Sequence, residues 1–167
     1  MKLRIKSLRK DEIKDLRTKI QETLGIGEIF LPQGCRVEVF SPEKEEIYVV
    51  DGEPVFYKGE DGTVVPLLVY VLKFNLPLPK VTVDIKAVPH VCNGADVFRP
   101  GVTQIDPAIK KGQTVVVTEE KNKKPICVGR SLMDASDMQK ASGGKVIINI
   151  HYVGDSIWNF SKTLAKR

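Results

Sequence analysis

The chain has 167 residues, of which 42% are hydrophobic and 28% charged, which is the composition of a globular protein with a buried core. Its longest uncharged apolar run, residues 64–72, is far too short to span a membrane. The three cysteines are scattered and the N-terminus lacks the apolar segment of a signal peptide, so we expect a cytoplasmic protein without disulfides.

The formal net charge of +5 is distributed unevenly along the chain. Residues 1–80 contain 13 basic and 13 acidic side chains, whereas residues 81–167 contain 13 and 8. All of the excess positive charge therefore belongs to the second half. A localised excess of this kind favours an anionic partner, and a well-solvated basic surface explains the same count equally well.

The first half begins with residues 1–8, which predict a short strand because Leu3 and Ile5 alternate with Arg4 and Lys6. From residue 10 the apolar spacing changes to that of an amphipathic helix ending at Gly25, and its apolar positions are Ile13, Leu16, Ile20 and Leu24. The opposite face of this helix is charged, which is typical of a solvated surface and does not by itself indicate binding.

Three further segments predict a small sheet. Residues 35–40 alternate, and residues 47–50 and 54–58 flank Asp51-Gly52, a dipeptide typical of a tight hairpin turn. The apolar run over 64–74 is compatible with a buried strand or a short buried helix. Leu76-Pro77-Leu78-Pro79 then interrupts regular structure. We place the domain boundary there, with one domain over 1–78 and a second over 79–167.

The second half alternates short strands and turns. Residues 81–85 predict a strand, Pro89 suits the first turn of a short helix, and Asp134–Ala141 predicts another helix with Ser136 as its cap. Further strands are expected over 113–120, 124–132, 145–152 and 156–160. Strands at this spacing favour a small closed or nearly closed β structure.

The residues do not assemble a pattern typical of catalysis. His90 and His151 lie 61 residues apart, and neither has a serine or cysteine nearby that would form a nucleophile–base pair. His90 and Cys92 lack the second pair that a structural metal site needs. Gly143-Gly144-Lys145 lacks the upstream glycine and following helix of a phosphate loop. We expect no catalytic residues, no metal and no cofactor.

Several features of the second half suit RNA. Lys86 and Arg99 lie near turns whose backbone amides can approach phosphates. His151 and Tyr152 offer flat rings on which unpaired bases can stack, although a core position for Tyr152 is an equal alternative. Asp96 does not fit an anion-binding surface, and we expect it to accept a hydrogen bond from its own turn.

The motif GADVFRPGV at residues 94–102, preceded by VTVDIKAV, resembles the signature of the PUA domain, an RNA-binding pseudo-barrel. ICVGRS at 126–131 and KVIINIHYVGDSIW at 145–158 extend the resemblance. It implies a groove formed by the short helix, the loop after it and a neighbouring strand. The residues carried over are Lys86, Gly94, Ala95, Asp96, Val97, Arg99, Pro100, Gly101 and Val102, with Ile150, His151 and Tyr152 as the other wall.

The whole chain resembles the malignant T-cell-amplified sequence family of translation factors, in an archaeal-type form. The resemblance implies an α+β fold: an N-terminal small α/β domain followed by a C-terminal PUA pseudo-β-barrel. It also implies partners, namely the small ribosomal subunit, RNA (a tRNA 3′ end or rRNA) and a possible protein docked on the N-terminal domain.

We therefore expect a non-catalytic RNA-binding protein that acts in initiation, reinitiation or recycling. The alternatives are a ribosome-biogenesis adaptor and an RNA-binding targeting subunit of an RNA-modification enzyme, because PUA domains also accompany pseudouridine synthases and archaeosine transglycosylases. The first 80 residues are too few for the catalytic domain of such an enzyme and contain no histidine.

Overall fold

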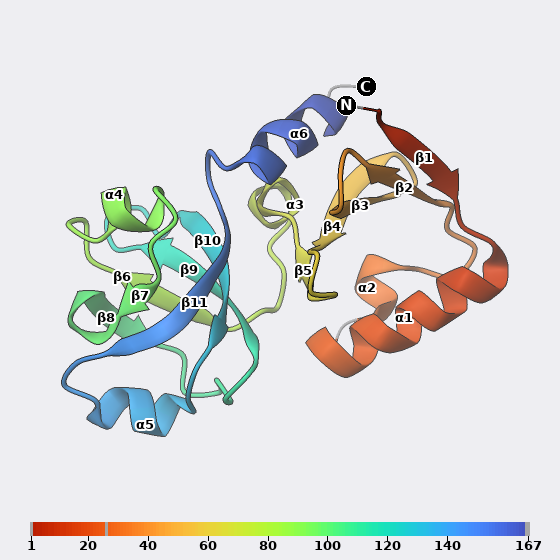
Figure 1. Cartoon of the computed structure of the whole chain (residues 1–167). Coiled ribbons are helices and arrows are strands. Elements are labelled where there is room, and N and C mark those ends of the chain that lie inside the picture. Colours follow the sequence, from red (N-terminus) through yellow and green to blue (C-terminus); the bar gives the residue numbers. More distant parts are fainter. Residues whose placement is uncertain (1, 26, 166–167) are drawn as a thin grey trace.

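The computed structural model describes residues 2–25 and 27–165, which form two β-sheets side by side (Figure 1). The first sheet is antiparallel, with strands in the order β1-β2-β3-β4-β5. Its strands are β1 (Arg4–Ser7), β2 (Val37–Ser41), β3 (Glu46–Val50), β4 (Glu53–Lys58) and β5 (Val64–Pro66). The helices of this half are α1 (Lys10–Leu24), α2 (Gly27–Phe30) and α3 (Leu68–Lys73).

Local sequence explains most of these elements. The α1 helix ends at Gly25, which has a φ of 74° and so takes the left-handed conformation that glycine tolerates best. The β3–β4 turn has positive φ at both Asp51 and Gly52, as the Asp-Gly pair predicts. Ile13 and Ile20 are the buried residues of α1. The helix, the strand at the N-terminus and the hairpin are thus confirmed.

The apolar run over 64–74 forms both of the elements that its sequence allows. Residues as far as Pro66 pair with β4, and α3 then begins at Leu68. Proline has no N–H for the sheet ladder and is best placed where pairing ends. The run is buried from Val64 to Leu68, so its strand part shows no alternation, whereas α3 buries Leu68 and Val71 and exposes Leu72.

The second half forms a sheet in the order β7-β11-β10-β9-β6-β8. Its strands are β6 (Lys80–Val83), β7 (Val97–Phe98), β8 (Val102–Ile105), β9 (Thr114–Glu119), β10 (Pro125–Ser131) and β11 (Lys145–Tyr152). A single 3₁₀ turn, Arg99–Gly101, joins β7 to β8, the two ends of the pairing order. The sheet therefore curls into a nearly closed barrel, as expected for a PUA pseudo-barrel. Its helices are α4 (Val88–Val91) and α5 (Ala135–Lys140).

Steric crowding explains why position 129, in the ICVGRS motif, is a glycine. A Cβ placed there would lie 2.4 Å from the carbonyl oxygen of Ile148 and 2.6 Å from Cγ2 of Ile147. The register between β10 and β11 also shifts at Val128/Gly129. Only glycine permits so close an approach of the two backbones at this bulge.

Two local predictions were wrong. Residues 156–160 are not a strand but the start of helix α6 (Ser156–Ala165), because Asp155 accepts a hydrogen bond from the Trp158 N–H at 2.7 Å and so caps the helix. Ser136 does not cap α5. Asp134 precedes that helix, and its carboxylate accepts a hydrogen bond from the Lys111 N–H instead.

The chain returns to its first half at its end. In Figure 1, β11 leads out of the barrel into α6, which lies near α3 and the first sheet. Ile157 and Leu164 of α6 belong to the hydrophobic core of the first half, as do Val116 of β9 and Val128 of β10. The two halves thus share buried surface. Within the described residues, no helix is long and apolar enough to cross a membrane.

Candidate RNA interface

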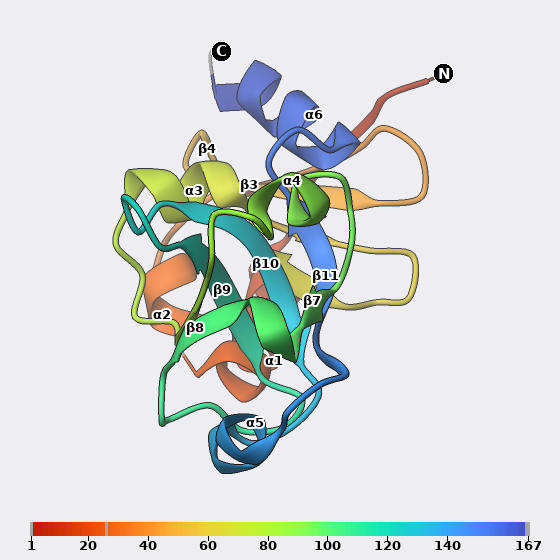
Figure 2. The same ribbon diagram turned by 90° about the vertical axis from the view of Figure 1, so that its left-hand side faces the viewer.

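The short helix α4 and the loop after it form one rim of the barrel. Pro89 lies in the first turn of α4, where its missing N–H costs nothing. The Asp84 carboxylate accepts a hydrogen bond from the Ala87 N–H at 2.9 Å and so fixes the turn that leads into the helix. In Figure 2, with the barrel toward the viewer, α4 and β7 lie beside β11.

Asn149 on β11 holds the loop after α4 in place. Its side-chain N–H groups donate to the carbonyl oxygens of Val91 and Ala95, at 3.0 and 2.9 Å. Its backbone N–H donates to the Asp96 carboxylate at 2.8 Å. These three bonds pin the loop to a strand of the barrel, which makes the rim preorganised.

Gly94 brings the same loop against an aromatic ring. Its φ is 95°, and a Cβ placed there would lie 3.3 Å from a ring carbon of Tyr152. The half-buried Tyr152 ring therefore supports the loop on this side, which is closer to the core role than to an open stacking platform.

Asp96 does not accept a hydrogen bond from its own turn, and that prediction was wrong. Its second oxygen pairs with Lys145 Nζ at 2.9 Å. Burial by itself raises the pKa of Asp96, but the bonds from Lys145 and from the Asn149 N–H outweigh it and hold the pKa below the ordinary value. Asp96 is thus a neutralised anchor rather than an exposed acid on an anion-binding surface.

A cavity of about 340 Å³ opens between α4 and this loop. Its walls are mostly apolar and include Ala87, Val91 and Val97. His90 is exposed at its edge, and Phe98 keeps 51% of its surface exposed. The exposed Phe98 ring beside an apolar cavity, with the flat ring of His90 at the edge, has the shape and chemistry to hold an unpaired base.

The structure gathers several of the predicted site residues around this cavity. Ala95, Asp96, Val97 and Gly101 line it, and Gly94 lies in the same loop. Lys86 and Pro100 are exposed close by in the chain. The side chains of Val97 and Val102 are buried, so they shape the rim from within.

The strand residues expected to form the second wall of the groove are placed differently in the structure. His151 is fully buried, and its ring does not provide a stacking surface. Its Nε2 accepts a hydrogen bond from the Leu68 N–H at 3.1 Å, while its Nδ1 lies 2.9 Å from the Asp155 carboxylate. Ile150 is half-buried, and its carbonyl accepts a hydrogen bond from the Tyr57 hydroxyl at 3.0 Å. These residues join the two halves of the molecule.

Arg99 is half-buried, and its guanidinium is hydrogen-bonded to backbone carbonyls. Its Nε donates to the carbonyl of Met138 at 2.6 Å, and its Nη1 donates to that of Val102 at 3.2 Å. These bonds tie α5 to the turn between β7 and β8. Two of its three guanidinium nitrogens therefore serve the fold, which the sequence did not indicate.

Sequence reasoning missed three residues of this surface: His90, Phe98 and Asn149. His90 was weighed only as a catalytic base and as a metal ligand. Phe98 carried a signal, because successive residues of a strand face opposite sides, so an inward Val97 predicts an outward Phe98. The structure shows this arrangement. Asn149 carried none, since its partners lie more than 50 residues away in the chain.

Metal-ligating and nucleophilic groups are sparse across the molecule. Residues 2–25 and 27–165 contain no group of three His, Cys, Asp or Glu side chains that could hold a metal ion. Cys35, Cys92 and Cys127 are free. Burial raises the pKa of each of these thiols, so they are poor nucleophiles at neutral pH.

Comparison with known proteins agrees with the geometry. Residues 79–153 match the model of the PUA domain, and residues 7–74 match that of a domain of unknown function, DUF1947. Translation machinery-associated protein 20 of Saccharomyces cerevisiae is 33% identical over 138 residues, which is 78% of this chain and 76% of that protein. The chain belongs to this protein's family.

Other members of this family fit the same picture. An uncharacterised protein of Methanocaldococcus jannaschii is 40% identical over 92% of this chain and 94% of its own. Human malignant T-cell-amplified sequence 2 is 34% identical over 120 residues, which is 70% of this chain and 66% of that protein. The crystal structure of a hypothetical protein from Pyrococcus horikoshii superposes with a TM-score of 0.80 at 32% identity, covering 95% of this chain and 99% of that one. The resemblance drawn from the motifs is confirmed, and so is the fold class.

Proposed function

We propose that this protein is a non-catalytic RNA-binding factor that acts in translation at the small ribosomal subunit. In this proposal it recognises the single-stranded end of a tRNA or a segment of rRNA through the rim of its PUA domain. The observation that carries the proposal is the apolar cavity beside α4, flanked by His90 and the exposed ring of Phe98. The name of the yeast relative, translation machinery-associated protein 20, supports a role in translation.

The chemistry of the rim suits a single-stranded end. A base inside a duplex presents its flat faces to its neighbours, so only an unpaired base can enter an apolar hollow and stack on Phe98. Lys86 is exposed close to the cavity and has no ion-pair partner among the described residues, which leaves it available for a phosphate. The loop is fixed before RNA arrives, so little ordering entropy is lost on binding.

Phe98→Ala tests the cavity. Loss of one stacked base costs about 1–3 kcal/mol, so we expect affinity for a labelled single-stranded RNA to fall roughly 5- to 150-fold. Fluorescence anisotropy measures this directly. The matched control is Ile29→Ala, which removes an equally exposed apolar side chain from the first domain. Equal affinities of wild type and Phe98→Ala would contradict the proposed site.

Co-sedimentation with purified ribosomal particles tests the place of action. We expect the protein to travel with the small subunit, and Phe98→Ala to weaken that association. Exclusive association with the large subunit or its precursors would favour a ribosome-biogenesis adaptor. Capture of the full-length protein by an RNA-modification enzyme, with no ribosomal association, would favour a targeting subunit.

A further inference from the structure

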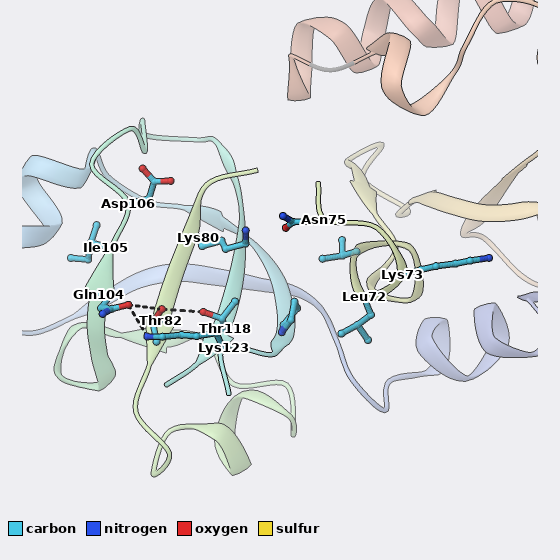
Figure 3. A pocket seen from close by; sticks show the side chains of 12 residues that line it. Leu72, Lys73, Asn75, Lys80, Thr82, Gln104, Ile105, Asp106, Thr118 and Lys123 are labelled. Carbon is cyan, nitrogen blue, oxygen red and sulfur yellow. Dashed lines mark hydrogen bonds between the residues drawn. The ribbon is translucent and has the colours of Figure 1, made fainter. Parts of the chain in front are cut away.

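A second and larger cavity, of about 640 Å³, lies between the two halves of the molecule. One wall comes from the barrel, including Lys80 of β6 and Gln104 of β8, and the other comes from the end of α3 and the segment after it, including Leu72 and Asn75. Figure 3 shows these two walls facing each other. This cavity is formed by elements other than the α4 rim, and the function proposed above does not use it.

The cavity presents hydrogen-bond donors and positive charge. Lys80 is exposed at its edge and pairs with no acidic side chain in the part of the chain that the structure describes. Lys123 faces it from the turn before β10, and the single acidic side chain lining it within that part of the chain is Asp106. Lys73 is also part of the wall but points away in Figure 3 and pairs with Glu53.

A network of side chains fixes the barrel wall. The Gln104 side-chain oxygen accepts hydrogen bonds from Lys123 Nζ at 2.7 Å and from the Thr82 hydroxyl at 3.5 Å. The Thr82 and Thr118 hydroxyls are buried and 3.0 Å apart. Because its oxygen is committed to these donors, the Gln104 amide is held in one orientation with its N–H groups left to bind a ligand.

The same cavity has an apolar part. Leu72 keeps 36% of its surface exposed, and Ile105 and Pro125 line the barrel side. Its volume lies within the range of small-molecule sites, and the combination of cationic donors with an apolar patch matches a nucleotide: the phosphate meets the lysines and the base rests on the aliphatic side chains.

We propose that this interdomain cavity binds one nucleotide unit of an RNA chain, as a second contact separate from the α4 rim. The inference rests on the proposed RNA-binding function and extends it. Lys80 and Lys123 bind the phosphate, while the side-chain amides of Asn75 and Gln104 donate to the sugar or base. A site between the halves also makes RNA affinity depend on their relative placement.

The first test uses the full-length, ¹⁵N-labelled protein and adenosine 5′-monophosphate as the probe. We expect the side-chain amide signals of Asn75 and Gln104 to shift with AMP and to shift little with adenosine. In the variant Lys80→Gln/Lys123→Gln the AMP affinity should fall at least about tenfold, because the phosphate loses two charge-assisted contacts. The control Lys44→Gln removes a lysine that is 76% exposed on the first domain and should change nothing. Absence of AMP shifts, or equal shifts in the double variant, would overturn the proposal.

The second test separates RNA from free nucleotides as the source of the phosphate. For a single-stranded RNA of mixed sequence, log affinity falls linearly with log salt concentration. In Lys80→Gln/Lys123→Gln this negative slope should become shallower by about 0.7 for each lysine contact removed. Suppose that wild type shows the AMP shifts but that the salt slope is the same in wild type and in the double variant. The cavity would then bind free nucleotides, and the RNA assignment would be overturned. If wild type binds no RNA at all, the proposed function fails, and that result is distinguishable because the AMP titration reads the cavity alone. Phe98→Ala should leave the AMP shifts of Asn75 and Gln104 unchanged.

Discussion

Arg99 illustrates how one residue of a binding motif can serve the fold. Its sequence position beside Pro100-Gly101 predicts a cation for phosphate, and a loss of RNA affinity without unfolding in Arg99→Ala. In the structure its guanidinium instead bridges the carbonyls of Met138 and Val102. A half-buried guanidinium that satisfies two backbone carbonyls stabilises the segments it joins, and those carbonyls lose their partners when it is removed.

The expected result for Arg99→Ala is therefore a loss of stability of about 1–3 kcal/mol. Urea unfolding measures this loss. The salt dependence of RNA binding should keep its slope, because two of the three guanidinium nitrogens already donate to backbone carbonyls. Arg99→Lys, which restores the charge but cannot bridge both carbonyls, should not recover the lost stability. Full recovery by lysine would mean that charge alone matters at this position.

Among the elements, α6 depends on one carboxylate that also reaches β11. Asp155 accepts hydrogen bonds from the Trp158 N–H at 2.7 Å, from the Tyr152 N–H at 3.0 Å and from His151 Nδ1 at 2.9 Å. Burial by itself raises the pKa of Asp155, but the hydrogen bond from His151, followed by those from the two backbone N–H groups, brings the pKa below its ordinary value of 3.8.

This lowered pKa fixes the sign of a pH effect. A carboxyl whose pKa is lower in the folded state contributes stability above its unfolded pKa, and this contribution is lost as the pH falls through the folded pKa. At neutral pH we expect Asp155→Asn to lower the free energy of unfolding by about 1–3 kcal/mol. Denaturant titrations over a pH series should show the difference from wild type shrinking below pH 3.8. A difference that grows toward acid would contradict this account.

At the scale of the whole molecule, the two halves are joined through a buried polar contact. The fully buried His151 receives the Leu68 N–H of α3, and the Tyr57 hydroxyl of β4 donates to Ile150 of β11. Burial raises the pKa of Tyr57, which keeps its hydroxyl protonated as a donor at all ordinary pH values. The ring planes of Tyr57 and His151 meet edge to face, with centroids 5.6 Å apart.

His151→Ala should therefore weaken the joint between the halves. It leaves a cavity and removes the partners of the Leu68 N–H and the Asp155 carboxylate, so we expect a loss of roughly 3–5 kcal/mol. Tyr57→Phe keeps the ring and removes one bond, with an expected loss of about 1 kcal/mol. Calorimetry of both variants measures these losses. If His151→Ala proves as stable as wild type, the contact does not hold the halves together. The proposed boundary near Pro79 remains a prediction.

Much of this protein follows from short-range sequence. Gly25 ends α1, Asp51-Gly52 turns the hairpin, and the GADVFRPGV motif indicates the barrel, because each of these signals lies within a few residues of the structure that it specifies. Charge counting likewise assigns the positive excess to the second half.

What only the tertiary structure decided involves contacts between distant residues. Residues 156–160 are helical where a strand was expected: the Asp155 cap is local, but the placement of Ile157 in the core of the first half depends on residues far away in the chain. His151 reads as an exposed ring at the end of a strand, yet it is buried because α3 packs over it from 83 residues away. Asn149 fixes the loop of the α4 rim, and Gln104 and Leu72 line opposite walls of the interdomain cavity, for the same reason. Burial and pairing depend on which segments the fold brings together, and a local pattern does not contain that information.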